Sequence, residues 1–367
     1  MSVIIFLIIL ALLILVHEFG HFIIAKKSGI RVDEFGLGFP PKIFAKKFGD
    51  TLYTLNLIPF GGFVKIFGED PHNGEINEER KHESFYYKPK WIQASVLIAG
   101  VTMNVLFAWL LISLGFMMGL PSSVGQNTFG EVKNARTVIT EIFPESPAQK
   151  IGLQAGDTIL FVSSGTLGLQ DENLEPEKVQ ELILGSQGKN IEILYKRGDA
   201  GVPTTVLVKP NTDQNTGRSF VGVALDRVGT LKLPIHLALL EGAETTVYLV
   251  KSITIGLGNF LWDIVAFKSD FSQVSGPVGI AGIVSDARAL GFVYLLTLTA
   301  LISINLAVIN LLPFPALDGG RLFFLLIEVI IRRPIPPKFV QWANATGFLL
   351  LIALMVVVTA NDILMLF

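Results

Sequence analysis

Four stretches of this chain are long and apolar enough to cross a membrane as helices, and they constrain the fold more than any other feature. They cover residues 2–25, 92–119, 291–313 and 346–367. About 20 mainly apolar residues are needed to cross roughly 30 Å of hydrocarbon in helical form. Of the 367 residues 51% are hydrophobic and 16% are charged, whereas soluble domains carry about 25% charged residues. The sequence therefore predicts a polytopic α-helical membrane protein with four transmembrane helices.

The first of these stretches contains three ionisable side chains within five residues, in the run His17-Glu18-Phe19-Gly20-His21. This run matches the pattern H-E-x-x-H, in which the two histidines lie one helical turn apart and share a face. Both imidazoles can then reach one Zn²⁺ ion, and the neighbouring glutamate can move a proton to or from a water molecule at that ion. The pattern predicts a zinc hydrolase with Glu18 as its general base.

An alternative is that these side chains only form hydrogen bonds to neighbouring helices in a protein core. In a membrane that explanation weakens, because one charged residue at the centre of a spanning helix costs about 2.5–3.5 kcal/mol on insertion scales. Three such residues in five positions need a compensating role, and ligation of a metal supplies one.

A catalytic zinc ion takes three protein ligands, so a third must come from elsewhere in the chain. There is no cysteine, and the remaining histidines, His72, His82 and His236, stand in polar or extramembrane stretches. Asp318, in NLLPFPALDGG, is the best candidate, because the glycine pair after it allows close approach of backbone. Glu328 is the alternative third ligand.

The distribution of basic residues predicts the orientation of the spans. Lysine and arginine crowd the connection between the first two spans and recur after the third, at Lys26, Lys27, Arg31, Lys42, Lys46, Lys47, Lys65, Arg80, Lys81, Lys88, Lys90, Arg332, Arg333 and Lys338. The positive-inside rule places these segments in the cytoplasm and both chain ends outside it. Asp318 then reaches the depth of His21, near the cytoplasmic face, only if 246–267 does not cross. We therefore expect 246–267 to be an amphipathic helix at the outer interface.

The sequence of the segments between the spans predicts two further folded parts. Residues 30–67 form short strand-like runs separated by turn residues, which predicts a small antiparallel sheet with an apolar last hairpin. Residues 127–230 are soluble in composition, with strands expected at 137–143, 157–163, 190–196, 204–209 and 219–225 and a helix at 176–184. The expected parts are thus 1–28 (first span), 29–90 (cytoplasmic β-region and loop), 91–120 (second span), 127–230 (an inserted α+β domain), 231–290 (extracytoplasmic amphipathic helices), 291–330 (third span with Asp318) and 341–367 (fourth span).

Four ordered motifs together resemble the site-2 protease family of intramembrane zinc metalloproteases, close to the bacterial regulator of sigma-E protease subgroup. They are the H-E-x-x-H run, AGVTMN at 99–104, SGPVGI at 275–280 and NLLPFPALDGG at 310–320. The resemblance covers nearly the whole chain and implies His17, His21 and Asp318 as zinc ligands and Glu18 as general base. It also links Asn104 to substrate handling, although a helix-packing hydrogen bond would explain this residue equally well.

The resemblance further implies that 30–67 is a membrane-associated β-region whose edge strand holds an unwound substrate segment. Pairing as a strand would expose the scissile carbonyl and satisfy the backbone of the substrate. Leu55, Leu57, Gly61, Gly62 and Phe63 of the last hairpin are the residues expected to bind the substrate.

Residues 127–230 resemble a PDZ domain, because EIFPESPAQKIGLQAGDTIL at 141–160 has the bacterial pattern S-P-A-x-x-x-G-L-x-x-G-D. This inserted PDZ domain is expected to be extracytoplasmic. Gly152, Gly156 and Asp157 are expected to shape turns. A peptide ligand would pair beside Phe220, Val221, Gly222 and Val223 and against the helix at 176–184. We see one such domain, whereas the best-known members of the subgroup carry two.

The leading hypothesis from the sequence is a zinc endopeptidase of the bacterial inner membrane that cuts single-span proteins, such as anti-sigma factors or signal-peptide remnants. The expected partners are such substrates, a peptide ligand of the PDZ domain and membrane lipid. The net charge of −2 gives no indication of nucleic-acid binding. One alternative is a catalytically silent PDZ scaffold, and another is a metal transporter. The transporter is disfavoured because the ionisable groups form a single cluster near one face.

Overall fold

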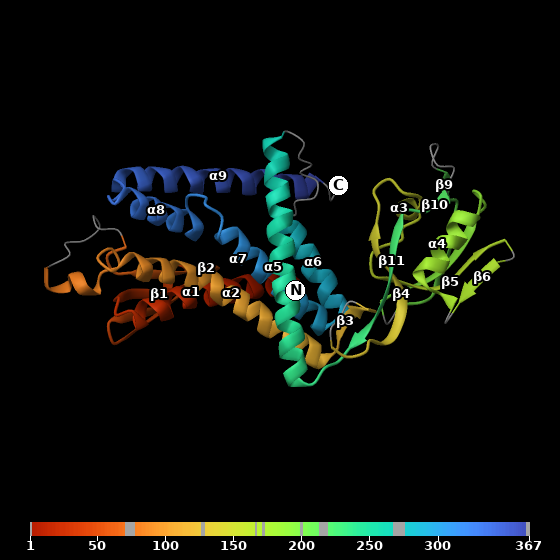
Figure 1. The fold of residues 1–367 in the computed structure, drawn as a ribbon, viewed down its shortest axis with the longest axis horizontal. Helices are drawn as coiled ribbons and strands as arrows, with labels where there is room; N and C mark the ends of the chain where they lie inside the picture. Colours follow the sequence, from red (N-terminus) through yellow and green to blue (C-terminus); the bar gives the residue numbers. More distant parts are fainter. Residues whose placement is uncertain are drawn as a thin grey trace. The chain divides into compact units, whose positions relative to one another are not determined.

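The computed structural model describes residues 2–69, 78–125, 129–165, 167–170, 173–198, 201–212, 219–266 and 276–364. His72 and Ser275, named above, lie outside these ranges. The described chain divides into two compact units. Unit 1 comprises residues 1–113 and 242–367, and unit 2 comprises residues 114–241 (Figure 1).

Four helices of the described chain are long and apolar enough to cross a membrane, which confirms the number predicted from sequence. They are α1 (Ser2–Lys27), α2 (Lys90–Met118), α7 (Phe292–Asn310) and α9 (Pro337–Leu364). Lys26 and Lys27 lie in the last turn of α1, where their positive charges stabilise the negative end of the helix dipole. Gly29 follows with φ of +66°, a conformation that ends a helix at little cost for glycine.

The third predicted span, 291–313, corresponds to α7, and Asp318, in the same expected part 291–330, lies on a different helix. Helix α7 ends at Asn310, and a separate helix, α8 (Asp318–Ile331), begins after seven intervening residues. Pro313 and Pro315 stand in the connection, and proline removes a backbone donor and prevents a helix from continuing. Asp318 is therefore the first residue of a new helix.

The β-region of unit 1 consists of two long, bent strands, β1 (Val32–Phe48) and β2 (Thr51–Ile66), which form their own antiparallel sheet. Several register shifts let one strand pair twice, so that Phe35 lies opposite both Val64 and Tyr53. A 3-10 helix, η1 (Glu78–Glu83), precedes α2. The sheet packs on α1 through a core that includes Ala25, Ile30 and Ile66. The predicted small sheet is present, and it rests on the helix that carries the H-E-x-x-H run.

Two more helices stand between the sheet of unit 2 and α7 in the chain: α5 (Ile235–Val265), which begins within the last residues of unit 2, and α6 (Pro277–Leu290). Helix α5 is not among the four candidates for crossing a membrane, and in Figure 1 its course is crosswise to that of α9. Helix α6 packs against α1, where Val284 joins Ile9 and Leu13 in a buried cluster. Asp362 of α9 accepts hydrogen bonds from the backbone N–H groups of Gly276 (3.0 Å) and Gly279 (2.8 Å), at the start of α6.

Unit 2 is built on a seven-stranded sheet in the order β3-β11-β4-β5-β7-β8, with β6 paired to β5. Its elements are β3 (Leu120–Ser123), β4 (Lys133–Ile142), α3 (Pro147–Lys150), β5 (Asp157–Ser164), β6 (Leu167–Gln170), α4 (Pro176–Gly185), β7 (Ile191–Arg197), β8 (Thr204–Val208), β9 (Asn211–Thr212), β10 (Ser219–Phe220) and β11 (Val223–Leu231). Its core gathers Ile139, Val162, Val179 and Ile191 between sheet and helix. Four of the five expected strands and the helix at 176–184 are present. The fifth expected strand, 219–225, is divided between β10 and β11, and β3, β6 and β9 were not predicted.

Asp157 holds a turn of unit 2 together, as the sequence pattern indicated. Its buried carboxylate accepts hydrogen bonds from Gln154 N and from both Nε and Nη2 of Arg197. These bonds to the carboxylate raise the pKa of the Arg197 guanidinium. Gly152 and Gly156 lie in the same turn with φ of +79° and +92°.

Candidate active site

Helices α1 and α2 meet at the H-E-x-x-H run with no room for additional atoms. A Cβ atom at Gly20 would lie 2.3 Å from the carbonyl oxygen of Ala99, and one at Gly100 would lie 2.5 Å from Nε2 of His21. Small residues at such a crossing let two backbones approach closely within a membrane. The crossing leaves His17 and His21 only 6% and 8% exposed.

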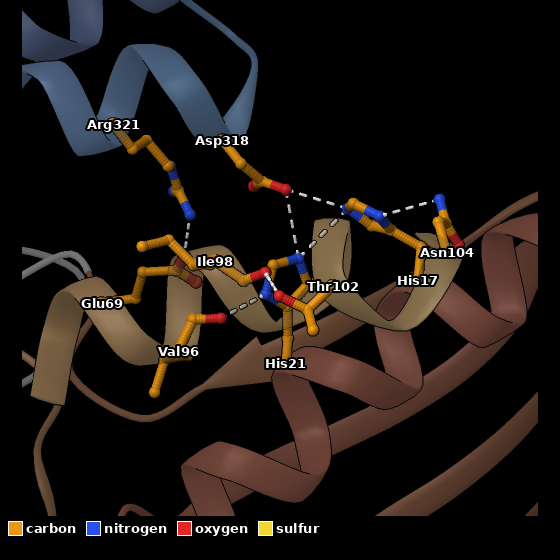
Figure 2. A network of polar contacts seen from close by, with 9 residues as sticks. All are labelled: His17, His21, Glu69, Val96, Ile98, Thr102, Asn104, Asp318 and Arg321. Carbon is orange, nitrogen blue, oxygen red and sulfur yellow. Dashed lines mark hydrogen bonds and ion pairs between the residues drawn. The ribbon is translucent and has the colours of Figure 1, made fainter. Parts of the chain in front are cut away.

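Three potential metal ligands converge at this crossing (Figure 2). Nε2 of His17 lies 2.9 Å from Oδ2 of Asp318, Nε2 of His21 lies 3.2 Å from the same oxygen, and the two Nε2 atoms are 3.2 Å apart. Two histidine nitrogens and one carboxylate oxygen form a common ligand set of catalytic zinc sites, which keep a fourth position open. Among the described residues this is the group of histidine and acidic side chains placed to hold a metal.

The second nitrogen of His21 is already bonded in a way that suits a metal site. Nδ1 donates a hydrogen bond to the carbonyl oxygen of Val96 at 2.8 Å. That bond places the proton on Nδ1 and leaves the lone pair of Nε2 directed toward Asp318. Metal-binding histidines commonly donate their other N–H to a carbonyl or carboxylate in this manner.

Asn104 offers the corresponding partner to His17. Its Nδ2 lies 3.3 Å from Nδ1 of His17, while its Oδ1 is buried and has no hydrogen-bond partner. Turning the amide over would let Nδ1 of His17 donate to Oδ1, and it would leave Nε2 of His17 free for a metal. The unpaired buried oxygen thus fits a site in which both imidazoles bind a metal through Nε2.

Asp318 reaches the two histidines because the chain before α8 is folded tightly. Cβ atoms at Gly319 and Gly320 would come within 2.2 Å of the carbonyl oxygens of Leu312 and Phe314, respectively. Only glycine fits at both positions, as the sequence analysis expected of this pair. The alternative ligand, Glu328, is engaged elsewhere: it forms an ion pair with Lys90 at 2.6 Å and accepts a hydrogen bond from the backbone N–H of Ile335.

Glu18 borders the same pocket as the metal ligands. The pocket is lined by Glu18, His21, Phe63, Val64, Ile66, Glu69, Val96, Leu97, Asp318 and Arg321, and we call it the catalytic pocket. A Cβ atom at Gly62 of β2 would lie 3.4 Å from Cγ of Glu18. The candidate base is therefore adjacent to the β-region.

The residues expected to bind the substrate divide into two groups. Gly62 and Phe63 lie on the part of β2 that borders the catalytic pocket, and Gly61 precedes them with φ of +104°. Leu55 and Leu57 lie in the earlier part of β2 and are 44% and 59% exposed. Among the described residues, Gly62–Ile66 pairs with β1 along one edge, and no strand pairs with its other edge.

The residues expected to bind a peptide in unit 2 have different surroundings. Phe220 is 43% exposed, whereas Val221 is 1% exposed and belongs to the core. The carbonyl oxygens of Val221 and Gly222 accept hydrogen bonds from Ala148 N and Phe143 N, and Val223 pairs with Ile142. Helix α4 lies beside β10 and β11.

Several residues of the site did not emerge from the sequence. Gly100 makes room for the imidazoles, and the carbonyl of Val96 orients His21, but a backbone carbonyl carries no signal in a sequence. Gly100 lies within the motif AGVTMN, so the sequence drew attention to its position but did not indicate that it contacts the imidazoles. Glu69 and Arg321, which form an ion pair beside the ligands, come from segments 252 residues apart.

Comparison with known proteins assigns the chain to a family. Residues 5–354 match the sequence profile of peptidase family M50. A relative from Clostridium perfringens, named "Putative zinc metalloprotease", is 36% identical over 364 residues and covers 99% of both chains. The zinc metalloprotease RasP of Bacillus licheniformis is 29% identical over 447 residues, which cover 100% of this chain and 99% of RasP. The chain therefore belongs to peptidase family M50, the site-2 protease family, and is a membrane-embedded zinc metalloprotease.

Proposed function

We propose that this protein is an intramembrane zinc endopeptidase that cuts single-span membrane proteins within or near their transmembrane segments. The observation that carries the proposal is the meeting of His17, His21 and Asp318 within 4.8 Å of one another, with both histidines on a helix apolar enough to cross a membrane. A site of this kind can reach a peptide bond within the membrane, which soluble proteases cannot reach. Such cleavage follows an earlier cut by another protease that shortens the outer part of the substrate.

In this proposal His17, His21 and Asp318 hold the zinc ion and Glu18 is the general base. Zinc supplies a Lewis acid that polarises the scissile carbonyl and makes water more acidic. Glu18 accepts a proton from the attacking water and passes it to the leaving nitrogen. Its position at the border of the catalytic pocket, next to Gly62, suits both transfers.

The substrate would enter as an extended strand along the free edge of Gly62–Ile66. A helical segment shields its peptide bonds with its own hydrogen bonds, and pairing with this edge replaces those bonds while exposing one carbonyl. The contact between Gly62 and Glu18 supports this placement, because a strand at that edge would lie beside the base. Leu55 and Leu57 would then contact the substrate farther from the site of cleavage.

We further propose that the protein spans the bacterial inner membrane with both termini outside the cytoplasm and the catalytic pocket near the cytoplasmic face. Lys26 and Lys27 end α1 only one turn beyond His21, and the exposed β1 carries more lysines. Unit 2 would then be extracytoplasmic. Its sheet, with α4 beside β10, is compatible with a PDZ domain that binds a peptide near Phe220.

Two substitutions test the proposed function. His17→Ala should lower both the zinc content of the purified protein and its cleavage of a model single-span substrate, because it removes a ligand. Glu18→Gln should retain stoichiometric zinc and lose cleavage, because it removes only the base. Full cleavage by the Glu18→Gln protein would exclude this mechanism, and absence of zinc from the unaltered protein would favour a scaffold.

A further inference from the structure

An ion pair beside the zinc ligands separates two cavities of unit 1. Arg321 lies on α8, one turn after Asp318, and its Nη1 pairs with Oε1 of Glu69 (Figure 2). Glu69 stands three residues beyond the end of β2, so the ion pair links the end of the β-region to α8. Their meeting joins the two elements that flank the catalytic pocket.

The second cavity lies on the other side of this pair, and we call it the antechamber. It is lined by residues that include Tyr86, Lys90, Gln93, Glu328, Val340 and Asn344. Its volume is about 190 Å³, and that of the catalytic pocket is about 220 Å³. Each is large enough for several water molecules, and the ion pair of Lys90 and Glu328 gives the antechamber the polar groups that hold water.

Three residues line both cavities: Glu69, Leu97 and Arg321. Backbone does not move readily, but the side chains of Glu69 and Arg321 are long and rotate about several bonds. The side chain of Glu69 is 25% exposed and that of Arg321 is 43% exposed, as expected for groups that face cavities rather than packed core. Ion pairs with this much exposure are held weakly, so separation of the pair is within reach of thermal motion.

We propose that the Glu69–Arg321 ion pair is a partition between the antechamber and the catalytic pocket, and that water reaches the zinc ligands when the pair separates. Hydrolysis consumes one water molecule for each bond cut, and a site between apolar helices cannot draw it from lipid. The antechamber supplies a hydrated route whose last barrier is a pair of side chains. This assignment of a route for the water of hydrolysis rests on the proposed function, but access of solvent is measurable without a substrate.

The absence of cysteine from the chain allows a direct test. Val64→Cys places a thiol in the catalytic pocket, and Val340→Cys places a matched thiol in the antechamber. Each single-cysteine protein, zinc-loaded and in detergent, is treated with the small charged reagent 2-sulfonatoethyl methanethiosulfonate. Glu69→Gln should raise the labelling rate of Val64→Cys about tenfold and leave the rate of Val340→Cys unchanged. Equal rates for Val64→Cys with and without Glu69→Gln would overturn the proposal.

Two further variants separate the partition from general loosening of the fold. Exchanging the charges, Glu69→Arg with Arg321→Glu, should restore slow labelling of Val64→Cys, and failure to restore it would overturn the role of the pair. Val340→Trp fills the antechamber and should cancel the acceleration caused by Glu69→Gln, and persistent acceleration would show that solvent enters by another path. Because labelling needs no proteolysis, a protein that cuts no single-span substrate would contradict the proposed function while leaving this result intact.

Discussion

Asn104 contacts the metal site closely enough to have a positioning role. Its amide lies against Nδ1 of His17, and its own backbone carbonyl accepts a hydrogen bond from Oγ of Ser303 at 2.8 Å. The sequence left two roles open for this residue, substrate handling and a packing hydrogen bond. The contact with His17 adds a third, which is orientation of a zinc ligand.

Replacement of Asn104 distinguishes these roles. Asn104→Leu removes the acceptor for Nδ1 of His17, and loss of such outer partners lowers metal affinity about 10–100-fold. Asn104→Asp keeps an oxygen at that position and should keep zinc bound. The measurement is competition for zinc with a chelator of known affinity. Unchanged affinity in Asn104→Leu, together with a raised KM for a model substrate, would assign the residue to substrate binding instead.

The choice between Asp318 and Glu328 as third ligand is tested in the same way. Asp318→Asn leaves a poorer ligand at 2.9 Å from His17, so zinc affinity should fall by at least tenfold. Glu328→Gln breaks the ion pair with Lys90 but should leave zinc affinity unchanged. If zinc affinity falls in the Glu328→Gln protein and is unchanged in the Asp318→Asn protein, the assignment of the third ligand is wrong.

At the scale of elements, the crossing of α1 and α2 decides whether the ligands can meet. Gly20 and Gly100 face this crossing from the two helices, and each would clash through a single added carbon. The crossing also brings the carbonyl of Val96 to His21 and the amide of Asn104 to His17. One helix therefore carries two of the candidate ligands, and the other carries the groups that contact their Nδ1 atoms.

Gly100→Ala tests the importance of this crossing. The new Cβ would lie 2.5 Å from Nε2 of His21 and 2.8 Å from Cε1 of His17, so the helices or the imidazoles must shift. We expect zinc affinity and cleavage to fall by at least tenfold. Gly282→Ala in α6 is the matched control, because nothing lies within 4 Å of its added carbon. A helical alanine there is favoured by up to about 1 kcal/mol over glycine, so stability should be kept or improved.

At the scale of the whole molecule, the proposed topology depends on α5 not crossing the membrane. Its charged residues, among them Lys251 and Asp263, disfavour a span, and apolar side chains such as Val247 and Trp262 are about 70% exposed. The proximity of Asp318 to His17 requires the two residues to lie at one depth. An odd number of crossings between α2 and α7 would place them near opposite faces.

Single cysteines also test this topology, in intact cells treated with a maleimide that cannot cross membranes. Lys46→Cys in β1 should be protected, and Glu181→Cys in unit 2 should react. Lys232→Cys before α5 and Asp286→Cys after it should both react, because α5 stays on one side. Reaction at only one of these two positions would mean that α5 crosses the membrane.

The sequence by itself determined the features that depend on local pattern. The lengths of the apolar stretches predicted the four membrane helices, the alternation of residues and turns predicted the strands of unit 2, and the spacing of His17 and His21 predicted a shared helical face. Asp318 was reached by elimination, and the structure brings it to the two histidines. The helices and strands could be predicted because each rests on residues close in the chain, and Asp318 could be proposed because suitable ligands are scarce.

Only the tertiary structure decided what depends on contacts between distant segments. It placed Asp318 at the start of a helix separate from α7, gave Gly100 its place against the imidazoles, joined Lys90 to Glu328 and paired Glu69 with Arg321. Each of these contacts joins positions that are dozens to hundreds of residues apart, or depends on a backbone carbonyl that every residue carries. The sequence therefore indicated the candidate catalytic groups, while packing of α1, α2, α8 and the β-region determines how these groups are brought together.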